Sequence, residues 1–124
     1  MPGYASTIMG GGLSAGTAQA IQGGAATAIS AAGTTQGTAT TLAKLAVHMI
    51  GTCASGAGVV LSASGTPGDD VWIFNGGANQ CLVYPPSTAK FNALATNAAF
   101  ILPINTNCVC KAVSATQWLV NMSV

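Results

Sequence analysis

Charge is what this sequence lacks most. Arginine and glutamate do not occur, and the 124 residues contain only three lysines, two aspartates and one histidine. Charged residues make up 4% of the chain, whereas an ordinary soluble domain has about 25%. A net charge of +1 gives little repulsion between copies, so a free monomer should associate at high concentration. We therefore expect a protein that functions in an assembled state.

Other absences argue against nucleic-acid and membrane partners. The three lysines, Lys44, Lys90 and Lys111, lie far apart in the sequence, and binding to nucleic acid needs clustered basic side chains. No stretch supplies the roughly 20 strongly apolar residues of a transmembrane helix. No basic segment precedes an apolar one, as it would in a secretory signal, so we expect synthesis in the cytoplasm.

The sequence offers little for catalysis. His48 is the one candidate general base, and a lone histidine in an apolar segment more often has a structural role. Asp69 and Asp70 are consecutive, so on a strand they would face opposite sides, and turn formation suits them better than a carboxylate pair. No GxxxxGK[ST] or GxGxxG motif is present. We expect no enzymatic activity and no cofactor.

Four cysteines, Cys53, Cys81, Cys108 and Cys110, allow three interpretations. They could bind zinc, form disulfides, or pack as small buried residues. The spacing C-V-C differs from the C-x-x-C pairs typical of zinc sites, and a bridge between positions i and i+2 of a strand is strained. We therefore favour reduced packing residues, and predict no metal site.

The composition divides the chain in two. Residues 10–41 read GGGLSAGTAQAIQGGAATAISAAGTTQGTATT, a composition that cannot build a core of its own. Its many glycines each cost about 1 kcal/mol in a helix interior. We predict an extended N-terminal arm over residues 1–41, with short strands or a helical turn around residues 25–32. Residues 42–124 are predicted to form the folded body.

The body reads as short strands separated by turn residues. LAKLAVHMIGTC (42–53) fits a helix or a strand, and the β-branched residues that follow favour a strand. VWIF (71–74) and CLVY (81–84) flank NGGANQ and predict a hairpin, with Gly76 and Gly77 available for positive φ. Strands of this length, without βαβ alternation, predict an all-β, antiparallel β-sandwich, possibly a jelly roll.

VWIF and CLVY are apolar on both faces, which predicts that both faces are covered. The chain is too short to bury several such strands twice, so we expect a second subunit to provide the outer cover. The candidate interface residues are apolar or aromatic: Trp72, Phe74, Leu82, Tyr84 and Trp118. Trp72, Tyr84 and Trp118 could alternatively stack on sugar rings.

A resemblance is carried by GTTQGTATTL, GVVLSASGTPGDDVWIFN, GANQCLVYPPSTAKFNAL, NAAFILP and CVCKAVSATQWLV, together spanning roughly residues 34–120. In order and pattern these segments resemble small structural proteins of tailed bacteriophages. They are similar to the decoration, or cement, proteins on the outside of icosahedral heads, and related β-modules occur in tail fibres. The long Gly/Ala/Thr arm departs from the pattern of that family.

The resemblance implies a β-sandwich or jelly-roll body, a homo-dimer or homo-trimer, and binding across joints between major capsid subunits on the surface of the virion. The alternative is a tail-fibre or head-fibre module that binds host glycans, for which an exposed cluster around Trp72, Tyr84 or Trp118 would be diagnostic. An enzyme would require a pocket that joins His48 to Asp69 or Asp70.

Overall fold

The computed structural model of the protein describes residues 24–43, 46–62 and 66–123, and every regular element in these ranges is a β-strand. The strands are β1 (Ala25–Ala31), β2 (Thr40–Thr41), β3 (Val47–Cys53), β4 (Gly58–Val60), β5 (Asp70–Asn75), β6 (Cys81–Tyr84), β7 (Lys90–Phe91), β8 (Phe100–Leu102), β9 (Asn107–Ala112) and β10 (Gln117–Met122). The predicted all-β class is confirmed. No helix in the described ranges is long and apolar enough to cross a membrane.

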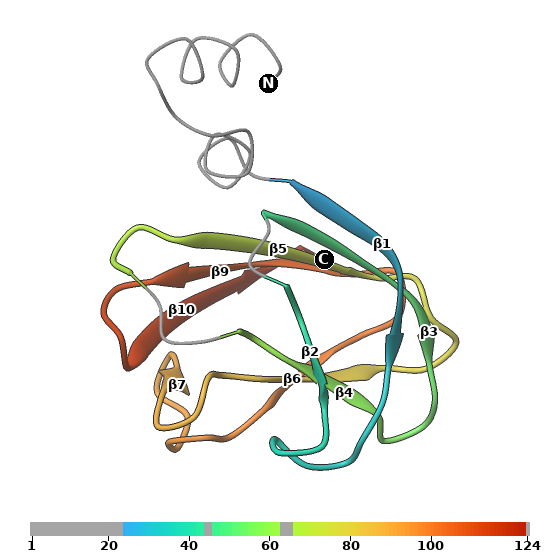
Figure 1. The fold of residues 1–124 in the computed structure, drawn as a ribbon, viewed down its shortest axis with the longest axis horizontal. Coiled ribbons are helices and arrows are strands. Elements are labelled where there is room, and N and C mark those ends of the chain that lie inside the picture. Colours follow the sequence, from blue (N-terminus) through green and yellow to red (C-terminus); the bar gives the residue numbers. More distant parts are fainter. Residues whose placement is uncertain (1–23, 44–45, 63–65, 124) are drawn as a thin grey trace, which may run out of the picture.

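The strands form two sheets, and from β1 to β9 the chain alternates between them, whereas β9 and β10 are consecutive strands of the same sheet. Sheet A has the order β1-β3-β5-β9-β10-β7, and sheet B has the order β2-β4-β6-β8. Strands β1, β3 and β5 are parallel in sheet A, as are β2, β4 and β6 in sheet B. The chain therefore coils as a β-solenoid of about 4 turns with mostly parallel strands. In Figure 1, β5, β9 and β10 cross the upper part of the molecule and β4 and β6 the lower part.

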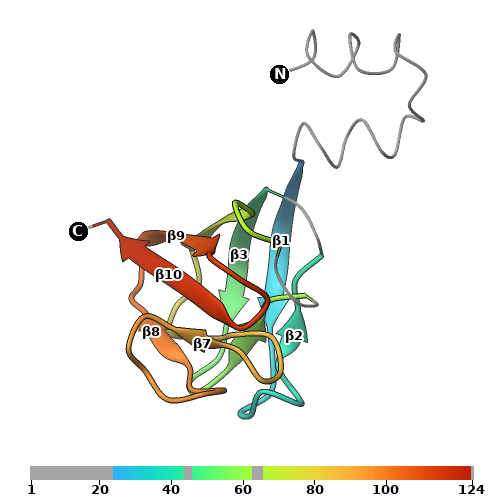
Figure 2. The same ribbon diagram turned by 90° about the vertical axis from the view of Figure 1, so that its left-hand side faces the viewer.

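The chain reverses direction in its C-terminal part. Strand β8 is antiparallel to β6, and β9 is antiparallel to β5. Strand β10 is antiparallel to β9, and the two-residue β7 pairs with β10 in parallel. Figure 2 shows β1 and β2 at one end of the solenoid and β8 at the other. The two ends therefore differ in strand direction: neighbouring strands are parallel at the end formed by β1 and β2, and mainly antiparallel at the end that includes β8.

The predicted antiparallel sandwich, or jelly roll, is wrong. VWIF and CLVY do form strands, β5 and β6, but they lie in different sheets and do not pair as a hairpin. The segment between them is a corner of the solenoid, and each strand pairs with the equivalent strand of the preceding turn. Such a stack gives parallel neighbours, whereas hairpins would have given antiparallel ones.

Asn75 holds this corner together from inside the protein. Its side chain is fully buried, and its Nδ2 donates to the carbonyls of Asn79 at 2.9 Å and Leu102 at 3.0 Å. Its Oδ1 accepts the N–H of Gly77 at 3.0 Å. The Asn79 amide in turn donates to the carbonyl of Cys53 at 3.0 Å. The corner is therefore bonded to the turns on either side of it, and its buried amide is satisfied.

Gly76 and Gly77 are needed for close packing, and neither has the positive φ expected from the sequence. A Cβ on Gly76 would lie 3.0 Å from the carbonyl oxygen of Ile50. A Cβ on Gly77 would lie 2.8 Å from the backbone nitrogen of Cys53. Both neighbours are backbone atoms of β3, so the glycines let successive turns approach each other.

The described part of the predicted arm is packed with the body. Residues 24–41 contain β1 and β2, which pair with β3 and β4 and so form the first turn of the described part of the solenoid. Strand β1 corresponds to the strand considered around residues 25–32, and β3 confirms the strand interpretation of the LAKLAVHMIGTC segment. The remainder of the predicted arm, residues 1–23, lies outside the described residues.

The core fills the space between the sheets, and the cysteines belong to it. Cys53, Cys81, Cys108 and Cys110 are buried and unbridged, as the packing interpretation predicted. Burial, and then the neighbouring Cys53, raises the pKa of Cys81 to about 12. A hydrogen bond with Cys108, together with burial, raises the pKa of Cys110 well above its usual value. Both remain neutral thiols at physiological pH.

Candidate functional site

The outward side of sheet A carries a contiguous set of apolar side chains. Alternation along β3 and β5 turns Ile50 and Ile73 into the core and leaves Val47, Met49 and Trp72 on the outside. The strands are in register, so the outward residues lie side by side. We define the outer face of sheet A by Val47, Met49, Trp72, Phe74, Val109 and Leu119.

Two rows of paired residues make up the centre of this face. In the first row, Val47 on β3 pairs with Trp72 on β5, and Trp72 pairs with Val109 on β9. In the second row, Met49 pairs with Phe74. Residues directly opposite on neighbouring strands lie within side-chain contact distance of each other. These five apolar side chains therefore form one patch, and Leu119 lies in the neighbouring row, where it pairs with Lys111.

The patch is exposed in the monomer and has a polar rim. Val47, Met49, Trp72 and Leu119 are 45%, 46%, 47% and 50% exposed. Asp70 and Lys111 form an ion pair of 3.4 Å on the same side of the sheet, in register with Leu119. An exposed apolar patch with polar residues around it is typical of a protein–protein contact.

The outer side of sheet B is different, because a turn of the chain covers part of it. The Tyr84 hydroxyl donates to the carbonyl of Thr34 at 3.1 Å, and Tyr84 is 9% exposed. Gln36 in the same turn donates to the carbonyl of Pro85 at 2.8 Å and to Oδ1 of Asn97 at 3.1 Å. Beyond this turn, the half-buried Leu82 pairs with the exposed Ile101 on the same side.

The five predicted interface residues lie in different places. Trp72 and Phe74 lie together on the outer face of sheet A, and Leu82 lies on the outer side of sheet B. Tyr84 is under the turn just described. Trp118 is part of the core, 3% exposed, and its indole N–H has no hydrogen-bond partner among the described residues.

Sequence reasoning missed four members of the outer face of sheet A. They are Val47, Met49, Val109 and Leu119. The available signal was alternation, because Val47 and Met49 flank His48, and Val109 lies between two cysteines. A strand with polar or small residues on one side and large apolar residues on the other has two distinguishable faces. Which face turns outward depends on the pairing of the strands.

The residues considered for catalysis have structural contacts. His48 is 1% exposed; its Nε2 is 2.8 Å from the carbonyl oxygen of Ala43, and its Nδ1 is 3.4 Å from that of Trp72. Asp69 forms the expected turn, since its Oδ2 accepts the N–H of Thr66 at 3.0 Å. Asp70 pairs with Lys111. His48 thus faces backbone carbonyls, a structural environment for a histidine.

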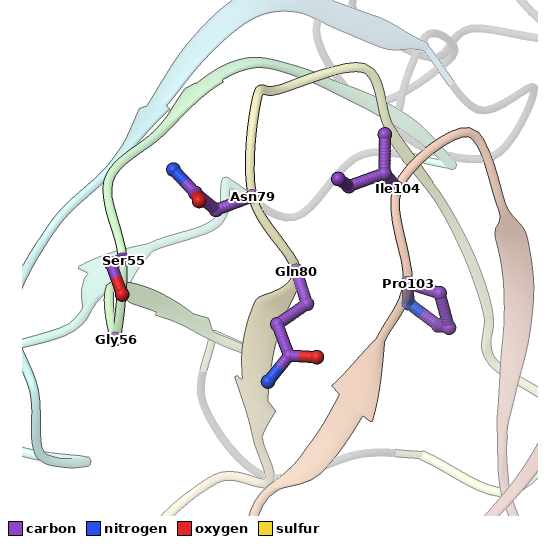
Figure 3. A pocket seen from close by; sticks show the side chains of 6 residues that line it. All are labelled: Ser55, Gly56, Asn79, Gln80, Pro103 and Ile104. Atoms are coloured by element: carbon purple, nitrogen blue, oxygen red, sulfur yellow. The ribbon is translucent and has the colours of Figure 1, made fainter.

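One open depression lies over the solenoid corners (Figure 3). It has a volume of about 600 Å³ and is lined by Ser55, Gly56, Asn79, Gln80, Pro103 and Ile104. These residues come from three stacked corners, and the lining includes neither His48 nor the two aspartates. Within the described ranges, no group of three or more His, Cys, Asp or Glu residues could hold a metal ion.

Comparisons with known protein families, with curated proteins and with solved structures find no match for this chain.

Proposed function

We propose that this protein is a non-enzymatic structural protein that binds other protein subunits through the outer face of sheet A. The observation that carries the proposal is the exposed apolar patch of that face, centred on Trp72 and Val47. Aromatic and methionine side chains are enriched in protein interfaces, and charged ones are depleted from interface centres. The patch has this composition, with its one ion pair at the rim.

The proposed setting is the surface of a tailed-bacteriophage head. The segments spanning roughly residues 34–120 resemble those of head decoration proteins, which makes the major capsid protein the proposed partner and self-association part of the assembly. Since the sandwich implied by that resemblance is wrong, the proposal rests on the exposed face and the scarcity of charge. Many copies that each bridge neighbouring capsid subunits would turn modest contacts into a stable coat.

A glycan-binding module is the second candidate, favoured by the exposed indole of Trp72. Sugar recognition requires polar groups that converge beside the aromatic ring. The neighbours of Trp72 in register are Val47 and Val109, which are both apolar. Tyr84 and Trp118, the other aromatic residues considered, are buried. Asp70, two residues from Trp72 on the same side, is already paired with Lys111. The in-register neighbours of Trp72 therefore favour a protein partner over a glycan.

The test compares the two outer faces of the solenoid. Val47→Asp places a charge on the outer face of sheet A, and Ile101→Asp places one on the outer side of sheet B; the two wild-type side chains are 45% and 48% exposed. Under the proposed capsid role, empty heads of the source phage are sedimented with each variant, and bound copies are counted by gel densitometry. We expect Val47→Asp to weaken binding by about tenfold or more, as at interface hot spots.

The control variant Ile101→Asp should bind empty heads like the wild type. Circular dichroism of both variants verifies that they remain folded. Equal binding by wild type and Val47→Asp, or loss of binding in Ile101→Asp alone, would contradict the assignment of the face. Binding of the protein to an oligosaccharide array, lost in Trp72→Ala, would instead support the glycan module.

A further inference from the structure

The first turn of the solenoid ends in two open strand edges. Strands β1 and β2 are the terminal strands of sheets A and B, and neither has a neighbour on its outer side among the described residues. Natural proteins usually protect exposed edges with charge, proline, bulges or a covering segment. Residues 24–43 contain no charged residue and no proline, and the irregular register of β1 near Ile29 gives that edge partial protection. A segment of chain lying along β1 and β2 would complete the protection of these edges.

The opposite end of the solenoid is protected. Strand β7, at the other edge of sheet A, has two residues, one of which is the exposed Lys90. Strand β8, at the other edge of sheet B, has three residues and is followed by Pro103. Short strands, lysine and proline are features that discourage further pairing. The contrast singles out β1 and β2 as edges suited to receive another segment.

The turn between β1 and β2 has specific chemical requirements. Gly33 has a φ of +78°, and a side chain there would overlap the backbone carbonyl of Thr38. The Thr38 hydroxyl accepts the N–H of Thr35 at 3.2 Å and is 2.8 Å from the Thr35 hydroxyl. This turn therefore needs glycine at position 33 and hydroxyl side chains at positions 35 and 38.

An earlier segment of the sequence meets the same requirements. Residues 33–39 read GTTQGTA, and residues 12–18 read GLSAGTA. When the two are aligned, glycine matches glycine at the first position, and the two hydroxyl positions are occupied by Ser14 and Thr17. Apolar positions match as well: Ile29, Ala39 and Leu42, which pack into or against the protein interior, correspond to Ile8, Ala18 and Ile21.

The spacing of this repeat agrees with the length of a solenoid turn. Pairing in register shows the turn length directly, because Ala25 pairs with Val47 in sheet A and Thr40 pairs with Val59 in sheet B. The sequence separation between residues 12–18 and residues 33–39 lies between these two turn lengths. It is shorter than the separation of Ala25 and Val47 and longer than that of Thr40 and Val59. Repeats in solenoid proteins stack on their immediate neighbours. The earlier segment therefore has the length and the pattern of a preceding turn.

We propose that the open edge of β1 and β2 is the docking site for residues 5–22 of the same chain. The bound segment adds one strand to each sheet by strand addition and gains main-chain hydrogen bonds there. It places Ile8 and Ile21 over Ile29 and Leu42, which extends the core by one layer. The connection from residue 22 to β1 is short, so docking within one chain costs little entropy.

The test measures amide hydrogen exchange of β1 in the full-length protein. Ile21→Asp puts a charge at the position equivalent to Leu42, which is 2% exposed. Leu13→Asp is the control, because its equivalent, Thr34, is exposed. We expect exchange in peptides covering β1 to accelerate by about tenfold or more in Ile21→Asp and to stay at the wild-type rate in Leu13→Asp, since an uncovered edge opens locally.

Three results would overturn the proposal. The first is an unchanged exchange rate in Ile21→Asp, and the second is the same acceleration in both variants. The third is protection of β1 that disappears when the protein is diluted, because the docked residues 5–22 would then come from a second copy. Docking within one chain gives protection that does not depend on protein concentration. None of these outcomes depends on capsid binding.

Discussion

The two outer sides of the solenoid differ in what covers them. On sheet B, the turn formed by residues 33–38 lies against Tyr84, whose hydroxyl donates to the carbonyl of Thr34. On sheet A, Trp72 and its neighbours have no such cover within the described ranges. The corner between β1 and β2 is long enough to fold back over sheet B, whereas the equivalent corner of the next turn, residues 54–57, is short.

The comparison separates apolar residues that stabilise the fold from those that need a partner. An aromatic ring under a turn loses its contact with water when the chain folds, so its burial contributes to the free energy of unfolding. An aromatic ring on an open face contributes little until another surface covers it. Tyr84 belongs to the first kind and Trp72 to the second, although both come from apolar runs of the sequence.

The largest expected effect comes from removing the covered ring. Tyr84→Ala should lower the free energy of unfolding by about 3–5 kcal/mol, because a buried aromatic side chain is lost. Trp72→Ala should lower it by less than about 1.5 kcal/mol, because 47% of Trp72 is already exposed, while weakening association with partners. Urea denaturation measures the first quantity and light scattering the second. Similar losses of stability in the two variants would contradict the distinction.

The second prediction tests the fit of Tyr84 against sheet B. A Cβ on Gly58 would lie 2.8 Å from the Leu82 carbonyl oxygen and 3.0 Å from the Tyr84 ring. Gly58→Ala should therefore lower the free energy of unfolding by about 1–3 kcal/mol, the usual cost of overpacking. Gly37→Ala is the control, since no atom lies within 4 Å of its Cβ position. Thermal denaturation should show a clear loss for Gly58→Ala alone; equal melting temperatures would refute the close fit.

The sequence predicted which segments are strands but not how they pair. VWIF, CLVY and VHMIGTC are strands because their apolar and β-branched residues favour extended backbone. The NGGAN segment between two of them is equally compatible with a hairpin loop and with a solenoid corner. What selects the corner is the bonding of Asn75 to Leu102 and of Asn79 to Cys53, partners that are distant in sequence.

The candidate site was predicted only in part, because the sequence does not show how the strands pair. Trp72 and Trp118 both lie in apolar strands, and the pattern within each strand does not say which side faces the core. Pairing decides it: Trp72 pairs with the outward Val47, whereas Trp118 pairs with the buried Ala112 and Phe91. Once strands are placed in sheets, alternation identifies the outer face of sheet A directly.

The third prediction concerns the hydroxyl that holds the covering turn. Tyr84→Phe keeps the ring and removes the hydrogen bond of 3.1 Å to the Thr34 carbonyl. The expected loss in the free energy of unfolding is about 0.5–1.5 kcal/mol, the net value of one hydrogen bond. Urea denaturation measures it, and the proposed binding to empty heads is the control, since the outer face of sheet A is unchanged. A loss as large as that of Tyr84→Ala would mean that the ring itself contributes little.

The smallest effects should come from the charged residues. Lys111→Gln breaks an exposed ion pair with Asp70 and should change the free energy of unfolding by about 0–1 kcal/mol. Binding through an apolar face should likewise depend little on ionic strength, although screening shortens from about 10 Å at 0.1 M salt to about 3 Å at 1 M. The measurement is the number of bound copies per head across this range, for wild type and for Lys111→Gln. Steep loss of copies with salt, or failure of Lys111→Gln to bind, would show that charge rather than the apolar face of sheet A holds the protein on its partner.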